Sequence, residues 1–477
     1  MTEPLERRLL EKDSDGTPWL GVLALAAVVA HPTQASVDLL AGAPRGHLNV
    51  CLADLVMAAA FVAWVVQRLR SRDWSPPAAA PAALLGTLWL VLSLVPQLKG
   101  AAAESLNVSR AGVAKAVQFA EYYVVGAIVF TEAFALERRR KRVVWALAAV
   151  TFSALLCALW QYVSVSYGVT DVRGSGFDSR SAFGMFLALV VPLLFGVAVF
   201  SKARWAWCVG AATVFLAMCL SLAGGPFLAM LIGVLIVAAL RGRTAFAVAA
   251  VGMLVVSLFL LPLLPRDNGD VLLDSVLLYR TDDPHRAFGG DVQSIRAREN
   301  KKRSELARAL ARGERVTAAD LPGESDASWR WEQRYKEWQA ALRMTAASPL
   351  FGVGAGSYQH NVNRFYDMPK YPVNLLEPDT LNGYLVWSAS AGLPFLAILL
   401  ALYTRALLAT ARAYGSLRSW LDRGMAAGVL GALAALVVGG LFTNPLVRGV
   451  GVTVALILAL AETLRRASMG VAERRGR

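Results

Sequence analysis

The chain has 477 residues, of which 56% are hydrophobic and only 17% are charged, and its mean hydropathy is +0.49. In a soluble chain about a quarter of the residues are charged, so this composition excludes an ordinary soluble enzyme or binding domain. The net charge of +14 would suggest a nucleic-acid ligand in a soluble protein. In so apolar a chain the positions of the basic residues decide their meaning, and we expect no nucleic-acid partner.

The apolar residues occur in blocks of about 20, the length of helix that crosses about 30 Å of hydrocarbon. We therefore predict an all-α integral membrane protein with about twelve transmembrane helices. The predicted spans are residues 17–30, 49–67, 79–97, 113–135, 143–167, 181–200, 205–221, 224–240, 244–264, 383–403, 424–441 and 449–464.

Basic residues gather in every second connection between these spans. With the N-terminus inside, "QRLRSR", "ERRRKR" and the tail "RRASMGVAERRGR" all fall on the cytoplasmic side. This distribution is the positive-inside bias of membrane proteins, and it predicts that both termini are cytoplasmic. The first span follows a segment without a small-residue cleavage site, so we expect it to remain as an anchor.

One connection, residues 266–380, is much longer than the others. Because nine predicted spans precede it and the N-terminus is inside, we expect it on the outer side. It divides the chain into residues 1–265 with nine helices, the outer loop 266–380, and residues 381–477 with three helices and a basic tail. Within the loop, "VQSIRARENKKRSELARALARGE" predicts an amphipathic surface helix, favoured as a roof over the domain rather than as a partner-binding element.

A second loop helix is predicted in "WRWEQRYKEWQAALRMTAASP", where Trp331, Tyr335, Trp338 and Leu342 share one face and Pro349 ends the helix. On this helix an arginine, Arg334, lies four residues before Trp338, so the cation and the ring can meet. The arginine could equally bind phosphate, and the spacing leaves both roles open.

The stretch that follows, "SPLFGVGAGSYQHNVNRFY", is a candidate anion site. Glycines such as Gly352 and Gly354 let backbone N–H groups approach an anion, and Arg364 adds a cation. Arg173 and Arg180 lie in "VRGSGFDSRSAFG" on the same outer side, which is otherwise poor in arginine. They could bind substrate or anchor the chain at the interface by snorkelling. The outer-face anion nearest to a membrane protein is a lipid head group, including a polyprenyl diphosphate.

Three residues are candidate general bases. His360 titrates near neutral pH, although an isolated loop histidine is more often structural. Glu377 and Asp379 precede the tenth span, where partial burial would raise the pKa of a carboxyl group. Asp379 could instead cap the helix, and Thr380 is the favoured N-cap. The histidines and cysteines show no metal-ligand spacing, so we expect no metal and no other cofactor.

The run "RYKEWQAALRMTAASPLFGVGAGSY", followed later by "PDTLNGYLVWSASAGLPF", resembles the O-antigen ligase and polysaccharide-polymerase superfamily. So do "GSGFDSRSAFGMFLAL" and "KAVQFAEYYVVG". The resemblance implies a GT-C-like, metal-independent glycosyltransferase of the bacterial inner membrane. At the periplasmic face it would move a glycan from undecaprenyl diphosphate to an acceptor sugar in exopolysaccharide or O-antigen synthesis. Its partners would be the lipid-linked oligosaccharide, the bilayer and other polysaccharide-assembly proteins.

The resemblance carries over unevenly to single residues. Arg334 matches the family's loop arginine, and Asn382 and Tyr384 match its substrate-binding motif at the start of the tenth span. Gly224 stands where a second arginine opens the eighth span, and Leu381 stands where a histidine precedes the asparagine. Because ligases depend most on that histidine, a polymerase-like role is favoured over ligation.

Two other classes of function remain open. The two departures from the family pattern would suit a non-catalytic subunit of polysaccharide assembly. A twelve-helix secondary transporter is the other, but the long loop does not divide the chain into two six-span halves, and no internal repeat is visible.

Overall fold

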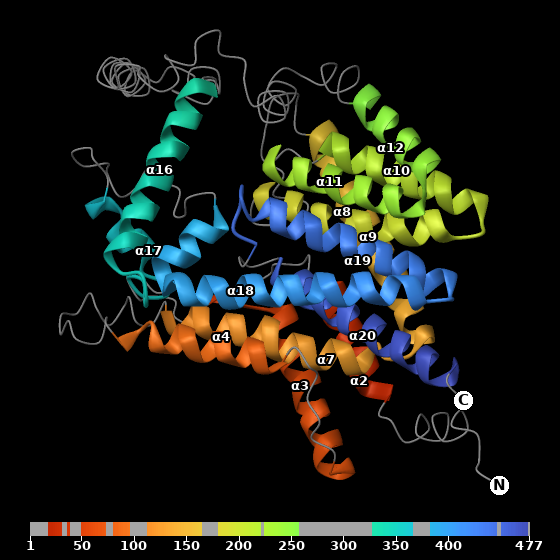
Figure 1. Ribbon diagram of the computed structural model, residues 1–477, viewed down its shortest axis with the longest axis horizontal. Coiled ribbons are helices and arrows are strands. Elements are labelled where there is room, and N and C mark those ends of the chain that lie inside the picture. Colours follow the sequence, from red (N-terminus) through yellow and green to blue (C-terminus); the bar gives the residue numbers. More distant parts are fainter. Residues whose placement is uncertain are drawn as a thin grey trace.

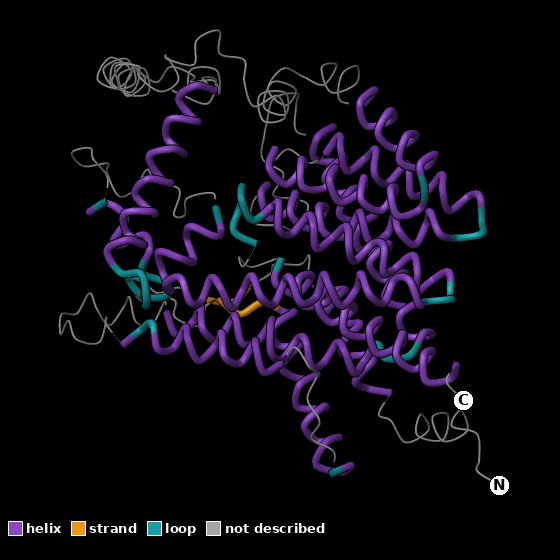
Figure 2. Tube along the Cα trace, in the orientation of Figure 1, coloured by secondary structure: helices purple, strands orange, loops and turns teal. Residues whose placement is uncertain are grey.

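The computed structural model describes residues 18–30, 36–38, 49–72, 80–95, 112–164, 180–220, 224–256, 327–365, 382–445 and 450–475. Apart from one pair of short antiparallel strands, β1 (Ser36–Asp38) and β2 (Asn49–Cys51), these residues form helices and their connections (Figure 2). The helices of the first half are α2 (Pro18–Ala30), α3 (Leu52–Ser71), α4 (Ala80–Leu92), the π-helix η1 (Ala120–Gly126), α7 (Ala127–Ala133) and α8 (Glu137–Ser164). They continue with α9 (Arg180–Phe200), α10 (Arg204–Leu220), α11 (Gly224–Arg241) and α12 (Arg243–Val255). The remainder are α16 (Ala327–Ala347), α17 (Tyr358–Asn361), the 3-10 helix η6 (Val362–Arg364), α18 (Gly383–Ser416), α19 (Trp420–Gly439) and α20 (Gly451–Arg475).

Every predicted span overlaps a helix among the described residues. Six helical segments are long and apolar enough to cross a membrane: Leu52–Arg70, Gly112–Ala133, Glu137–Trp160, Ala182–Phe200, Gly383–Ser416 and Trp420–Gly439. The integral membrane class is therefore supported, and the further crossings stay a prediction. The long outer loop is described only at residues 327–365, and the predicted amphipathic helix before them lies outside the described residues.

Several boundaries differ from the predicted spans. Residues 49–51 form β2 instead of the start of the second span, because they pair in register with β1. Helix α8 begins at Glu137 and includes the basic run "RRRKR". Helix α18 has 34 residues but is broken at Gly392; its longer part, residues 393–416, measures about 36 Å at 1.5 Å per residue, enough to cross a hydrocarbon core of about 30 Å.

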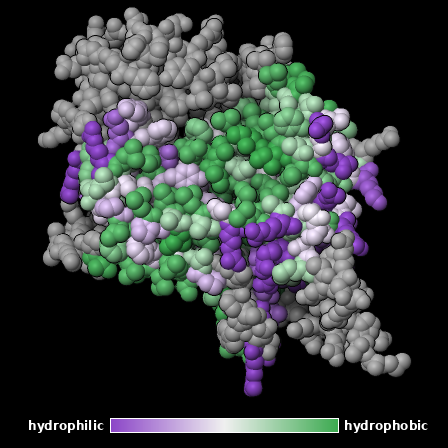
Figure 3. All heavy atoms as spheres, viewed as in Figure 1, coloured by the Kyte–Doolittle hydropathy of each residue, from purple (hydrophilic) through white to green (hydrophobic). Residues whose placement is uncertain are grey.

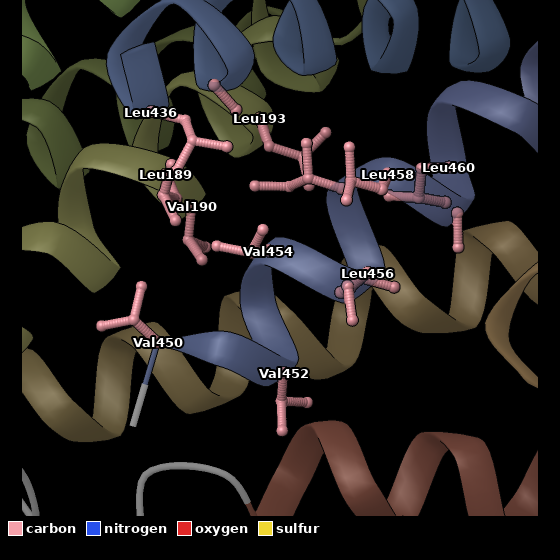
Figure 4. Packing of buried hydrophobic residues seen from close by; sticks show 14 of the residues in the cluster. Leu189, Val190, Leu193, Leu436, Val450, Val452, Val454, Leu456, Leu458 and Leu460 are labelled. Carbon is pink, nitrogen blue, oxygen red and sulfur yellow. The ribbon is translucent and has the colours of Figure 1, made fainter. Parts of the chain in front are cut away.

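The centre of the bundle is formed by α9, α11 and α19, which pack against one another. Small residues allow their backbones to touch: a Cβ added to Gly196 would lie 2.5 Å from the carbonyl oxygen of Gly424 and 2.7 Å from the amide nitrogen of Gly428. Such close approach is the usual way in which membrane helices associate. Against this layer α20 packs through buried aliphatic side chains, among them Val454 and Leu458 (Figure 4).

The motif "KAVQFAEYYVVG" falls on the helical segment Gly112–Ala133, which widens into the π-helix η1. The π-helix contains the buried Tyr123, whose hydroxyl lies 2.7 Å from the hydroxyl of Tyr403 on α18. This contact connects the first half of the bundle to the last three long helices.

Ion pairs gather at one end of the bundle. Arg140, at the start of α8, makes two hydrogen bonds of 2.8 and 2.9 Å to the carboxylate of Asp422 at the start of α19. Both side chains are buried. A buried guanidinium needs such a partner because an uncompensated charge away from water is costly.

A second group of charges joins α3, α7 and α20 at the same end. Glu132 accepts ion pairs from Arg68 at 3.0 Å and from Arg466 at 3.3 Å. Arg466 also pairs with Glu462, one turn earlier on α20. We call the region around Arg140, Asp422, Glu132 and Glu462 the ion-pair end.

These contacts bring together the helix ends that the alternation of basic segments assigns to one side of the membrane. The opposite end, with the start of α18, the end of α4 and α16, is here called the loop end (Figure 1). Figure 3 shows a broad hydrophobic surface across the middle of the bundle, with hydrophilic residues toward the two ends of the helices.

Candidate functional site

The loop end has a small hydrophobic core of its own, in which α16 packs against the start of α18. The residues at its centre are Ala340, Ala341, Met344, Tyr358, Val362 and Ala389. Thr345 of α16 and Ser388 of α18 share a hydrogen bond of 3.1 Å inside this contact. The described part of the long loop is thus fixed to the transmembrane bundle.

The face that α16 buries is formed by small residues. Tyr335 and Leu342 are 47% and 56% exposed, whereas Ala340 and Ala341 are fully buried. Ala340 and Ala341 face α18 because small side chains let the two helices approach closely, which bulky side chains would prevent. The helix does end before Pro349, as predicted.

The glycine-rich stretch after α16, residues 348–357, forms a compact loop that we call the glycine loop. Gly352, Gly354 and Gly356 have φ values of 64°, 102° and 75°, a region that side chains disfavour. The amides of Val353 and Gly354 donate hydrogen bonds of 2.9 and 2.8 Å to the carbonyls of Ala389 and Ser390 on α18. The loop therefore docks on α18 through its backbone.

Helix α18 offers these carbonyls because it is broken at Gly392, where φ is 84° and ψ is 170°. In a regular helix the Ala389 carbonyl would accept from Leu393, but the Leu393 amide donates to Pro349 in the glycine loop at 2.8 Å. The Ser390 carbonyl would face Pro394, which has no N–H. The glycine loop thus supplies the hydrogen bonds that the break removes, as buried backbone groups require.

Helix α4 encloses the glycine loop from the other side. The indole N–H of Trp89 donates to the carbonyl of Ala391 at 3.0 Å, and its ring stacks on Phe351 with centroids 5.5 Å apart. The Ala355 amide donates to the hydroxyl of Ser93 at 3.3 Å. The loop is therefore held between α4 and the broken part of α18.

Residues 209–400 match the family model described as O-antigen ligase. This segment runs from α10 into α18 and includes α16, the glycine loop and the break at Gly392. This match supports assignment to the O-antigen ligase and polysaccharide-polymerase superfamily. The resemblance stated from the sequence is thereby confirmed. No curated protein matches this chain.

The matched domain supports a glycosyltransferase-like role in polysaccharide assembly. Together with the membrane-spanning helices, it supports a multi-pass bacterial membrane protein. The partners that it supports are the bilayer and a lipid-linked polysaccharide.

Within the O-antigen ligase domain, the glycines have a defined structural part. The Gly352 amide donates to Ser348 at 2.9 Å, and the Gly354 amide donates to Ser390. Both amides are thus engaged by carbonyls of the protein itself. The predicted contact of these glycines with substrate stays a prediction, and in this structure they shape the loop.

The start of α18 is capped by Asn382 and not by Thr380. The side-chain oxygen of Asn382 accepts from the amides of Tyr384 and Leu385 at 3.1 and 3.2 Å, and the helix begins at Gly383. The prediction of Thr380 as the cap is therefore wrong, because a cap at residue 380 would start the helix at 381. Asparagine is a stronger cap than threonine, and the Asn382 side chain is buried.

Tyr384 and Trp387 join the start of α18 to the end of α19 and the residues that follow it. The Tyr384 hydroxyl donates to the carbonyl of Val437 at 2.7 Å. The indole of Trp387 donates to the side-chain oxygen of Asn444 at 3.1 Å. Asn444 is a buried polar residue at the loop end that sequence reasoning missed, and its position in "LFTNPL" between two apolar spans was the available signal.

The cationic side of the site lies on α16 and η6. Arg364 ends η6 and is exposed. Arg343, which sequence reasoning also missed, donates to the carbonyl of Phe365 at 3.4 Å and so joins α16 to η6. Arg334 lies on α16 and His360 on α17, although their side chains are not among those described.

Trp338 lies one turn after Arg334 on α16. It is half-buried, and its indole nitrogen is shielded from solvent without a hydrogen-bond partner among the described residues. Buried indole N–H groups usually find a partner, so this nitrogen is a place where a substrate hydroxyl could bind.

The other predicted site residues can be placed only in part. Arg180 begins α9, but its side chain is not described, and Gly224 begins α11. Arg173, Glu377 and Asp379 lie outside the described residues, as does Leu381. Their roles stay predictions.

Proposed function

We propose that this protein is a glycosyltransferase that moves a glycan from undecaprenyl diphosphate to an acceptor sugar at the loop end of the bundle. The observation that carries the proposal is the O-antigen ligase match over residues 209–400, because α16, the glycine loop and the break of α18 all fall within it. The indole nitrogen of Trp338, shielded from solvent and without a partner in the described part of the chain, supports the same location.

The chemistry needs cations for a leaving diphosphate and a base for an acceptor hydroxyl. Arg334 on α16 is the proposed main diphosphate contact, and the exposed Arg364 is proposed to assist it. Arg173 and Arg180 are proposed to approach from the start of α9. Guanidinium groups bind phosphate oxygens in a bidentate manner, so no metal ion is needed in this proposal.

In the proposed reaction the acceptor hydroxyl attacks the anomeric carbon while the bond from that carbon to the diphosphate oxygen breaks. The hydroxyl proton passes to His360, Glu377 or Asp379, and the diphosphate leaves with its charge held by arginine. The indole of Trp338 and the Asn382 and Tyr384 motif at the start of α18 are proposed to contact the glycan.

The proposed orientation puts the ion-pair end and both termini in the cytoplasm, with the loop end in the periplasm. It follows from the positive-inside bias, since Arg68, Arg140 and Arg466 lie at the ion-pair end. The proposed location is the bacterial inner membrane, with about twelve crossings.

A polymerase-like reaction is proposed over ligation. Leu381 replaces the histidine on which ligases of this superfamily depend, and Gly224 replaces an arginine. The acceptor would then be a second lipid-linked repeat unit rather than a lipid A core.

Arg334→Ala in a complemented deletion strain tests the proposal, with Arg412→Ala as the matched control. Arg412 is an exposed arginine on α18, on the side of the ion-pair end. We expect the Arg334 variant to reach the membrane at the level of the parent but to lose long surface polysaccharide. Trp338→Phe, which keeps an aromatic ring without the N–H, should shorten the product.

Gels of surface polysaccharide and of carrier-linked intermediates then distinguish the reactions. Single repeat units on the carrier lipid support the polymerase. Long chains left on the carrier support ligation. Polysaccharide of normal length in the Arg334→Ala strain would favour a non-catalytic assembly subunit and overturn the proposed chemistry.

A further inference from the structure

A long apolar groove lies on the outside of the bundle, far from the glycine loop. It runs between α10 and α12 over a floor of α9 and α11, and its volume is about 600 Å³. Its walls include Val214 and Met218 of α10 and Val248 and Met253 of α12. This volume is in the usual range for a small-molecule site, about 300–1,000 Å³.

Only one end of the groove is charged. Arg241, Arg243 and Thr244 line it where α11 turns into α12 at Gly242. The guanidinium of Arg241 lies over the rings of Phe200 and Trp207, at 5.2 and 5.7 Å from their centroids. These contacts hold a cation at the mouth of an otherwise apolar channel.

This charged mouth is at the ion-pair end. Arg423, which follows Asp422 of the buried ion pair, lies over the same Phe200 ring at 6.0 Å, and the Tyr414 hydroxyl donates to the carbonyl of Leu240 next to Arg241. From the mouth the groove follows the 13 residues of α12, about 20 Å of helix. One leaflet of a bilayer has about 15 Å of hydrocarbon, so the groove is as deep as a leaflet.

We propose that this groove binds an anionic phospholipid of the leaflet at the ion-pair end. Its phosphate lies between Arg241 and Arg243, and one acyl chain lies between α10 and α12. Charge complementarity selects this occupant. Basic pockets between helices on the cytoplasmic side bind anionic head groups, while a neutral lipid or an apolar helix would leave the two arginines unused.

The exposed surface around the groove suits the same occupant. Val248 and Val251 of α12 and Val209 of α10 are more than half exposed, so the rims of the groove are apolar as well. An acyl chain in the groove would contact apolar side chains on several sides, and the head group would remain at the interface with water.

Native mass spectrometry of the full-length protein, released from nanodiscs of phosphatidylglycerol and phosphatidylcholine, tests whether the charged mouth selects an anionic head group. We expect one phosphatidylglycerol to be retained in preference to phosphatidylcholine. Arg243→Gln should weaken its binding about fivefold, since a basic residue near the membrane surface contributes about 1 kcal/mol. Arg412→Gln, which removes an exposed arginine of α18 outside the groove, should leave the binding unchanged.

Gly252→Leu tests the apolar channel independently. Gly252 lines the groove, and a Cβ there meets nothing within 4 Å, so leucine enters the space of the acyl chain without disturbing the fold. We expect the retained phosphatidylglycerol to disappear. Gly415→Leu, another position with nothing within 4 Å, is the control.

Three outcomes would overturn the proposal. Equal retention of the two lipids would show that the mouth does not select charge. Retained phosphatidylglycerol in Gly252→Leu would show that the lipid sits elsewhere, and a polyprenyl phosphate that displaces it at equal concentration would identify the groove as a carrier-lipid site. All three readouts are independent of glycan transfer.

Discussion

Replacing Gly392 with alanine tests how the glycine loop is held on α18. Gly392 has φ 84° and ψ 170°, a conformation that is nearly restricted to glycine and costs about 1–3 kcal/mol for other residues. The added Cβ would also overlap the carbonyl of Leu350. The loop would therefore have to move away from the helix.

The displacement would break the three hydrogen bonds that join the loop to α18. Their donors are the amides of Val353, Gly354 and Leu393, and each bond contributes about 1 kcal/mol. With the backbone strain, the docked state loses about 4–6 kcal/mol. Such a loss would raise the exchange rate of these three amides by at least about a hundredfold.

Hydrogen exchange of the purified protein in nanodiscs, read on peptides that cover residues 348–357 and 389–394, measures this effect. Gly415→Ala is the control in the same helix, because a Cβ there meets nothing within 4 Å. Alanine should stabilise that helix by about 0.5–1 kcal/mol and leave the loop protected. Unchanged protection of the loop in Gly392→Ala would refute the docking described above.

Two further predictions concern the ion-pair end and the cap of α18. Asp422→Ala leaves Arg140 buried without its carboxylate partner. We therefore expect the free energy of unfolding to fall by about 3–5 kcal/mol and the melting temperature in detergent to decrease. A variant that melts at the temperature of the parent would show that the pair does not stabilise the fold. Asn382→Ala removes the cap, which costs about 1 kcal/mol, whereas Asn382→Asp keeps an accepting oxygen and removes the amide N–H₂. Normal stability with reduced polysaccharide in the aspartate variant would indicate substrate contact by Asn382, and normal polysaccharide would limit Asn382 to capping.

The helices of the bundle could be predicted from the sequence because their signal is local. Each apolar block is long enough to demand a helix, and the basic segments around Arg68, Arg140 and Arg466 indicated which ends belong together. The structure unites these ends through ion pairs. The choice of partners was not predictable, since Arg140 and Asp422 are 282 residues apart.

The loop end was harder to predict because its contacts involve the backbone. The glycines of residues 348–357 suggested an anion site, yet the amides of Val353 and Gly354 fill the hydrogen-bonding gap of a broken helix. Nothing in the local pattern of "SASAGLPF" gives the position of the loop relative to Gly392. The buried face of α16 could not be predicted for a related reason: aromatic residues such as Tyr335 dominate its sequence, but close helix packing selects Ala340 and Ala341.

The most direct test of the central proposal is glycan transfer by the purified full-length protein in proteoliposomes, with a radiolabelled repeat unit on polyprenyl diphosphate as the sole substrate. We predict carrier-linked products of two and more repeat units with the parent protein and with Arg412→Ala, and their loss with Arg334→Ala. A donor that stays unchanged with the folded parent protein, or products that form equally with Arg334→Ala, would contradict the account.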